Sequence, residues 1–170
     1  MYSQWDDICS ISEIIPKKIY LSGLYPIHNN PEKLKQLGIT HILGLTELYI
    51  SYGNDYIIKR INIEDNENVD ILKYQQEIID FMDGALKTNG IVLVHCMMGI
   101  SRSPTAVIMY IMYTCKFHYI TAYNLVKKKR FIINPNIGFV KQLLVYENHL
   151  QRSNGALLCN KASTSDIYRL

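Results

Sequence analysis

The residues with the clearest chemical potential lie in one short stretch, residues 94–104, which reads VHCMMGISRSP. An apolar run ends there in a His-Cys pair, and Arg102 follows six residues after Cys96. Backbone N–H groups of a tight loop that leads into a helix form a cradle for an anion, and an arginine can contact two phosphate oxygens at once. The same positive surroundings favour the thiolate form of a cysteine, which is its nucleophilic form. The stretch therefore predicts a loop that binds a phosphoryl group and presents a nucleophile beneath it.

The elements around this loop must hold it at the edge of a sheet. Residues 91–94 are a continuous apolar run, which is typical of a strand buried on both faces. Pro104 stands where it can open a long apolar helix, and Gly99 relieves crowding where the chain turns toward a bound group. In open α/β sheets, ligands bind where strands end and helices begin. The predicted loop lies at such a point.

Short β-branched runs alternate with amphipathic segments along the rest of the chain. This alternation predicts a single-domain α/β fold with a largely parallel sheet. We expect a body at residues 14–150, an N-terminal arm at residues 1–13 and a C-terminal tail at residues 151–170. The expected strands are residues 18–21, 40–45, 56–63 and 91–94, and the expected helices are about 31–37, 70–88, 104–114, 120–130 and 137–150.

Composition excludes several classes of protein. A net charge of +3 is too small to indicate nucleic-acid binding by itself. No stretch of about 18 apolar residues is present, and residues 1–13 lack the basic start and apolar core of a signal peptide. No CxxC pair occurs, so neither a zinc site nor a disulfide framework is predicted. We expect a soluble protein of the cytoplasm or nucleus, without membrane contact. The four cysteines are Cys9, Cys96, Cys115 and Cys159.

Four motifs together identify a family. Residues 95–104 carry the pattern His-Cys-x5-Arg-Ser of cysteine-dependent phosphatases, and three further stretches occur in order and at family spacing. The sequence is therefore identified as a member of the dual-specificity protein phosphatases, in the protein tyrosine phosphatase superfamily. The similarity covers about residues 14–150, and no separate docking domain is expected ahead of them, as in the small, atypical members. The three further stretches are IPKKIYLS at 15–22, INIEDN at 61–66 and KKRFIINPN at 128–136.

The resemblance implies a protein tyrosine phosphatase-like fold, with about five strands and about six helices. It also implies a role for each residue of the loop. Cys96 would attack phosphorus and form a phosphocysteine intermediate. Arg102 and the loop amides would bind the phosphate oxygens and stabilise the transition state, Ser103 would hydrogen-bond to the departing sulfur, and His95 would orient and electrostatically tune the loop. The expected phosphate-binding positions are Met97, Met98, Gly99, Ile100, Ser101 and Arg102.

The general acid is expected in the acidic loop before the helix at residues 70–88. Asp65 falls in the family's Glu-Asp-Asn loop, so the resemblance implies that it protonates the leaving oxygen and then acts as base toward the hydrolytic water. Glu64, Glu67 and Asp70 are near enough in sequence to be considered, and we interpret them as solvated charges.

Two residues within the stretch 128–136 are assigned to the substrate cleft. Arg130 matches a family position beside the cleft and would receive a second negative charge on the substrate. Asn136 would brace the loop from the neighbouring segment. The other basic residues of the run at 127–130 are interpreted as a solvated helix face. Residues 47–55 match no signature, so the loop that borders the pocket is left unassigned.

The resemblance predicts hydrolysis of phosphotyrosine and phosphoserine/threonine in proteins, with no metal and no organic cofactor. Met97 and Met98 favour protein substrates, because relatives acting on inositol lipids usually carry Lys in this loop and those acting on RNA 5′ ends carry a Thr-His pair. Two alternatives stay open: a phosphatase of such non-protein phosphates, and a phosphoprotein-binding module without turnover. Phosphorylated proteins are the expected partners, nucleic acid is not, and a homodimer stays open.

Overall fold

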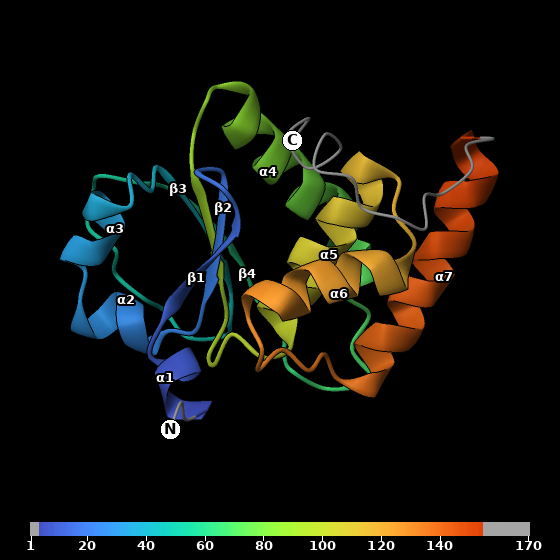
Figure 1. The fold of residues 1–170 in the computed structure, drawn as a ribbon, viewed down its shortest axis with the longest axis horizontal. Helices are drawn as coiled ribbons and strands as arrows, with labels where there is room; N and C mark the ends of the chain where they lie inside the picture. Colours follow the sequence, from blue (N-terminus) through green and yellow to red (C-terminus); the bar gives the residue numbers. More distant parts are fainter. Residues whose placement is uncertain (1–3, 155–170) are drawn as a thin grey trace.

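Five strands form one sheet in the order β1-β2-β5-β3-β4 (Figure 1). The computed structural model describes residues 4–154 of the chain. Strands β2, β5, β3 and β4 run parallel, and only the edge strand β1 pairs antiparallel, with β2. The expected α/β fold with a mostly parallel sheet is confirmed. The strands are β1 (Ile11–Ile15), β2 (Ile19–Ser22), β3 (His41–Leu45), β4 (Ile57–Ile61) and β5 (Val92–His95).

Helices cover both faces of the sheet (Figure 1). Four longer helices lie on one face, and two short helices, α2 and α3, lie on the other. Each face has its own cluster of buried apolar side chains, one around Ile78 and Met82 and one around Leu34 and Ile42. The helices are α1 (Gln4–Ile8), α2 (Tyr25–Asn29), α3 (Glu32–Gln36), α4 (Gln75–Lys87), α5 (Arg102–Cys115), α6 (Tyr119–Lys129) and α7 (Ile137–Asn154), with a 3₁₀ turn, η1 (Leu72–Tyr74), before α4.

The loop at residues 96–101 is held between two largely buried elements of the fold, β5 and α5. Strand β5 lies between β2 and β3, and all four of its residues are buried. Helix α5 packs against the sheet and against α4, α6 and α7, and its residues 102–112 are all buried. An all-round apolar helix is the sequence signature of such enclosure. Both ends of the loop are therefore fixed by close packing.

The element limits differ from the expected ones in a few places. Helix α5 begins at Arg102, before Pro104, so the arginine lies in its first turn. Strand β1 was not expected, and the anticipated boundary at residues 13 and 14 falls inside it. Short helices α1 and α2 were also not expected. Helix α7 runs past residue 150 to Asn154, and residues 155–170 of the expected tail lie outside the described part.

No helix within residues 4–154 combines the length and the apolar character needed to cross a membrane.

The burial of α5 gives a test of the packing that anchors the loop. Replacing the fully buried Ile111 by alanine removes buried methyl groups and leaves a cavity, so we expect a loss of about 2–5 kcal/mol in the free energy of unfolding. Leu144→Ala, on the exposed side of α7, is the control and should cost less than about 1 kcal/mol. Urea unfolding of both variants measures the difference, and equal losses would contradict this packing.

Candidate active site

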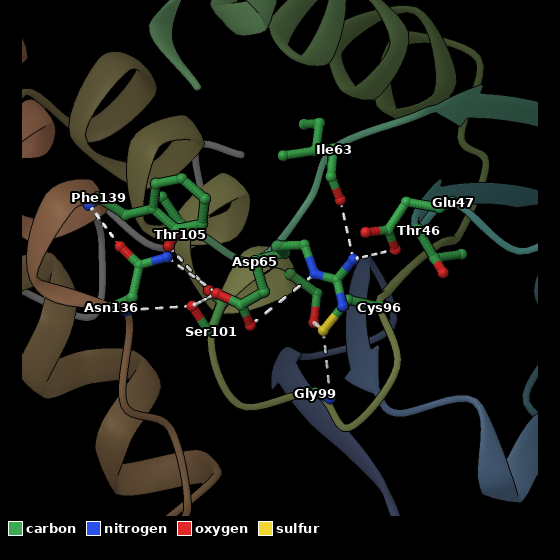
Figure 2. Close-up of polar contacts among 12 residues, drawn as sticks. Thr46, Glu47, Ile63, Asp65, Cys96, Gly99, Ser101, Thr105, Asn136 and Phe139 are labelled. Carbon is green, nitrogen blue, oxygen red and sulfur yellow. Dashed lines mark hydrogen bonds and ion pairs between the residues drawn. The ribbon is translucent and has the colours of Figure 1, made fainter. Parts of the chain in front are cut away.

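Cys96 lies just beyond the carboxyl end of β5, and two hydrogen-bond donors converge on its sulfur (Figure 2). The backbone N–H of Gly99 donates to Sγ at 3.3 Å, and the Ser103 hydroxyl donates to it at 3.2 Å. The residue is almost completely buried at the bottom of the loop. These contacts place a nucleophilic atom where the loop amides and the start of α5 meet.

The loop lies so close to β2 that glycine is required at position 99. Its φ is +68°, which disfavours residues with a side chain, and a Cβ there would lie 2.6 Å from the carbonyl carbon of Ser22. The loop is also tied to the start of α2 because the Leu24 N–H donates to the carbonyl of Met97 at 2.8 Å. Backbone contact on this scale fixes the path of residues 97–99.

Arg102 is held at one end of its guanidinium group. Nη1 donates to the Glu47 carboxylate at 2.9 Å and to the backbone carbonyl of Ile63 at 2.8 Å. Nε is buried and has no hydrogen-bond partner among the described residues, although a carboxylate oxygen of Asp65 lies 3.8 Å away. An unsatisfied buried N–H is costly. A phosphate oxygen beside the loop would supply the missing acceptor.

Glu47 follows β3, the strand next to β5, so the sheet brings its carboxylate to the edge where Cys96 lies. A hydrogen bond from its own backbone N–H, with a further contribution from Arg102, holds the pKa of Glu47 below its usual value. The charged carboxylate can therefore orient the guanidinium. Sequence reasoning missed this residue, although its place at the end of a buried strand was a usable signal.

Asp65 is fixed beside the loop by two donors. Its Oδ1 accepts from the Ser101 hydroxyl at 2.7 Å and from the side-chain amide of Asn136 at 2.9 Å (Figure 2). Ser101 Oγ in turn accepts from the backbone N–H of Asn136 at 3.0 Å. The structure thus brings together the residues expected to be acid and brace. Glu64 and Glu67 are exposed, as Asp65 is, and Asp70 accepts from backbone N–H groups at the start of η1.

His95 is fully buried behind the loop and makes two contacts. Nδ1 lies 3.2 Å from the carbonyl oxygen of Cys96, and Nε2 lies 2.5 Å from the Tyr52 hydroxyl. Burial lowers the pKa of His95 to about 4, with repulsion from Arg102 and Arg60 acting in the same direction. Burial also raises the pKa of Tyr52 to about 12, so its hydroxyl keeps its proton.

A neutral ring that accepts at one nitrogen carries its proton on the other. The Tyr52 hydroxyl therefore donates to Nε2 of His95, and Nδ1–H donates to the Cys96 carbonyl. The ring acts as a fixed dipole at neutral pH and not as a cation. Tyr52 belongs to the segment at residues 47–55 that matched no motif, and nothing in the sequence pointed to it.

The role expected for Arg130 is wrong. Its side chain is completely buried, so it cannot receive a charge on a substrate. Nε donates to the carbonyl of Gly99 at 2.9 Å and Nη2 to the carbonyl of Met98 at 3.2 Å. Nη1 donates to the carbonyl of Ser10 and to the hydroxyl of Ser12, both at 3.2 Å. Arg130 is thus a structural link between the loop at residues 96–101 and the N-terminal segment.

The side chains of Met97 and Met98 are partly exposed at the rim of the loop, 38% and 46%. Of the other cysteines, Cys9 and Cys115 do not contribute to the site. Cys9 is exposed, Cys115 is partly buried, and Cys159 lies outside the described residues. Within residues 4–154, no group of three His, Cys, Asp or Glu side chains could hold a metal ion.

Comparison with known proteins shows the family of the chain. A family model described as "Dual specificity phosphatase, catalytic domain" matches residues 19–149. The chain belongs to the dual specificity phosphatase family. The match includes Cys96, Arg102 and Asp65, and the predicted resemblance is confirmed.

Relatives of the phosphatase occur in distant organisms. It is 37% identical over 140 residues to "Putative tyrosine phosphatase 123R" of Invertebrate iridescent virus 6, covering 82% of this chain and 94% of that protein. It is 41% identical over 140 residues to "Probable rhodanese domain-containing dual specificity protein phosphatase" of Dictyostelium discoideum, covering 82% of this chain. The chain spans only 29% of the Dictyostelium protein's length.

Two solved structures share the fold of this phosphatase. One is the human tyrosine phosphatase-like serine/threonine/tyrosine-interacting protein, with a TM-score of 0.76 and 34% identity, covering 82% of this chain and 96% of that one. The other is human DUSP28, with a TM-score of 0.77 and 25% identity, covering 83% of this chain and 95% of that one.

Tyr52→Phe tests the contact behind the loop. Loss of the hydroxyl leaves Nε2 of His95 without its donor. We therefore expect Cys96 to react about fivefold more slowly with iodoacetate at fixed pH, a factor that corresponds to the free energy of one hydrogen bond. Tyr49→Phe is a matched control, because both tyrosine rings lie about 5 Å from the Arg60 guanidinium carbon, yet Tyr49 is exposed. Equal alkylation rates in the two variants would refute the contribution of Tyr52.

Arg130→Lys tests the link to the loop carbonyls. Lysine keeps the positive charge but cannot hold two carbonyl groups in the geometry of a guanidinium. We expect the inhibition constant for vanadate, a phosphate analogue, to rise about tenfold or more, since each hydrogen bond to a charged group contributes about 1.5–3 kcal/mol. The exposed Arg152 on α7 supplies the control substitution, Arg152→Lys. Unchanged inhibition by vanadate in Arg130→Lys would disprove the role.

Proposed function

We propose that the protein hydrolyses phosphate monoesters on tyrosine and on serine or threonine in proteins, through a phosphocysteine intermediate on Cys96. One observation carries the proposal: the buried Nε of Arg102 has no acceptor among residues 4–154, in the same loop that presents the Cys96 sulfur. That combination suits a bound phosphoryl group. The names of the relatives support phosphoproteins as the partners.

In the first step the Cys96 thiolate attacks phosphorus in line with the ester oxygen. The S–P bond forms as the P–O bond breaks, and Asp65 in its acid form gives its proton to the leaving oxygen. Arg102 and the loop N–H groups stabilise the charge that develops on the other phosphate oxygens. The hydrogen bonds from Ser101 and Asn136 support this assignment, because they keep Asp65 beside the loop.

In the second step a water molecule attacks the phosphocysteine. The Asp65 carboxylate takes the proton from the water, the S–P bond breaks, and inorganic phosphate is released. Ser103 favours this step because its hydroxyl, 3.2 Å from Sγ, donates to the sulfur as it becomes the leaving group. Neither step requires a metal ion or an organic cofactor.

An apolar rim supports protein side chains as substrates. Met97 and Met98 belong to the loop and are exposed, and Leu48 and Tyr49 are exposed directly after the site residue Glu47. Apolar surface here suits the peptide around a phosphorylated residue better than a highly anionic lipid headgroup. We place the activity in the cytoplasm or nucleus, since reducing compartments keep a nucleophilic thiol reduced.

A second candidate function is phosphoprotein binding without turnover. It is favoured by the likeness to the human protein described as tyrosine phosphatase-like and serine/threonine/tyrosine-interacting. Both functions would use the same loop, so only turnover separates them.

The test is release of phosphate from an aryl phosphate and from phosphotyrosine and phosphothreonine peptides. We expect Cys96→Ser to lower kcat by about a thousandfold or more, because the nucleophile is lost. Cys9→Ser, at an exposed cysteine, is the control and should retain full activity. Equal rates for Cys96→Ser and the unmodified protein would refute the mechanism. Tight peptide binding without turnover would favour the second function, and faster turnover of triphosphate-ended RNA or inositol lipids would favour a non-protein substrate.

A further inference from the structure

The loop that carries Asp65 follows the start of helix α7 over several residues. At the far end of this contact, both the oxygen and the nitrogen of the Gln142 side-chain amide hydrogen-bond to the backbone of the loop. Its Oε1 accepts from the N–H groups of Ile71 at 2.8 Å and Leu72 at 3.4 Å, and its Nε2 donates to the carbonyl of Val69 at 2.8 Å. One side chain therefore satisfies two backbone groups of the segment after the acidic residue and shares a third, the Leu72 N–H, with Asp70.

In the middle of this contact the two backbones touch. A Cβ atom built on Gly138 would lie 1.9 Å from the carbonyl oxygen of Glu67 and 2.6 Å from its Cα. No side chain fits between α7 and the loop at this point. Glycine is not needed here for an unusual backbone conformation, because Gly138 does not have a positive φ. The glycine therefore serves the close approach itself.

At the near end Asn136 donates to the Asp65 carboxylate. The contact between the loop and α7 therefore runs from this pair at one end to Gln142 at the other. Gly138 and Gln142 are four residues apart and thus lie on one face of α7. Phe139 and Leu143, in the same turns, are fully buried in the main core. The helix is thereby fixed to the body and can serve as a rigid support for the loop.

We propose that the first two turns of α7 clamp the acid-bearing loop against the phosphate-binding loop, with Gly138 and Gln142 as positioning residues for Asp65. This inference rests on the proposed role of Asp65 as general acid. Neither residue touches the reacting atoms. They act through the backbone of residues 67–72.

The reason for such a clamp is geometric. A general acid contributes about 10²–10⁴ in rate, but only within hydrogen-bond reach of the leaving oxygen. A displacement of about 1 Å can cost about a hundredfold. The need for the acid depends on the leaving group: an acidic phenol departs readily as its anion, whereas a weakly acidic phenol or an alcohol needs a proton. A misplaced acid therefore slows poor leaving groups selectively.

Gly138→Ala is the direct test, because its methyl group acts as a wedge between α7 and Glu67. We expect kcat/KM to fall about tenfold or more for phenyl phosphate and less than about threefold for an aryl phosphate with a strongly acidic phenol. Gly84→Ala is the matched control: Gly84 also lies in a helix, α4, and nothing lies within 4 Å of its Cβ position among the described residues. Its kinetics should be unchanged with both substrates.

Gln142 provides a second pair of variants, in case Gly138→Ala prevents folding. Gln142→Leu removes all three contacts, whereas Gln142→Glu keeps the acceptor for Ile71 and Leu72. We expect the same selective loss on phenyl phosphate, larger for Leu than for Glu. In an Asp65→Asn background neither Gly138→Ala nor Gln142→Leu should reduce the rate further by more than about twofold, because the acid is already absent.

The outcomes separate this proposal from the function on which it rests. If the unmodified protein and Cys96→Ser release phosphate equally, the proposed function has failed. If the protein turns over through Cys96, and Gly138→Ala and Gln142→Leu lower both substrates by one common factor or leave both unchanged, the clamp is overturned. If these substitutions lower the rate on phenyl phosphate by the same factor in the Asp65→Asn background as in the unmodified protein, the clamp is overturned as well.

Discussion

A loop that binds an anion through its backbone N–H groups must turn its carbonyl oxygens outward, because the two groups of a peptide plane point in opposite directions. Carbonyls buried on the outer side need donors of their own. Here the guanidinium of Arg130 provides them for Met98 and Gly99. The peptide group whose carbonyl belongs to Met98 has its N–H on Gly99, and that N–H reaches the Cys96 sulfur. The loop thus depends on a buried cation that binds its carbonyl oxygens.

Charge on the opposite side of the loop is arranged around a second arginine. Glu47 and the Ile63 carbonyl hold one nitrogen of Arg102, and Asp65 lies 3.8 Å from another. The guanidinium is oriented by these groups while Nε keeps its hydrogen-bonding capacity. A buried cation with charged partners avoids the cost of an unpaired charge. The same arrangement brings Asp65, the proposed acid, beside the arginine that we propose binds phosphate.

Much of the site could be predicted because its parts are close in sequence. The span from His95 to Ser103 is one loop and one helix turn, so its spacing already fixes which atoms can meet. The central strands β3 and β5 were found within one residue of their limits, since buried apolar runs between turn residues leave few alternatives. Strand β1 was not found, because it is a short edge strand that begins in a polar segment.

The sequence by itself determined the proposed nucleophile, the arginine beside it and the largely parallel sheet, because these follow from local spacing and from the pattern of apolar residues. Only the tertiary structure decided the contacts made across the chain. Nothing local shows whether Arg130 at the end of a helix faces solvent or buried carbonyls. The same holds for Tyr52, whose hydroxyl meets a histidine 43 residues away. Such pairings depend on how strands and helices pack, and packing distance is not encoded in the spacing of residues.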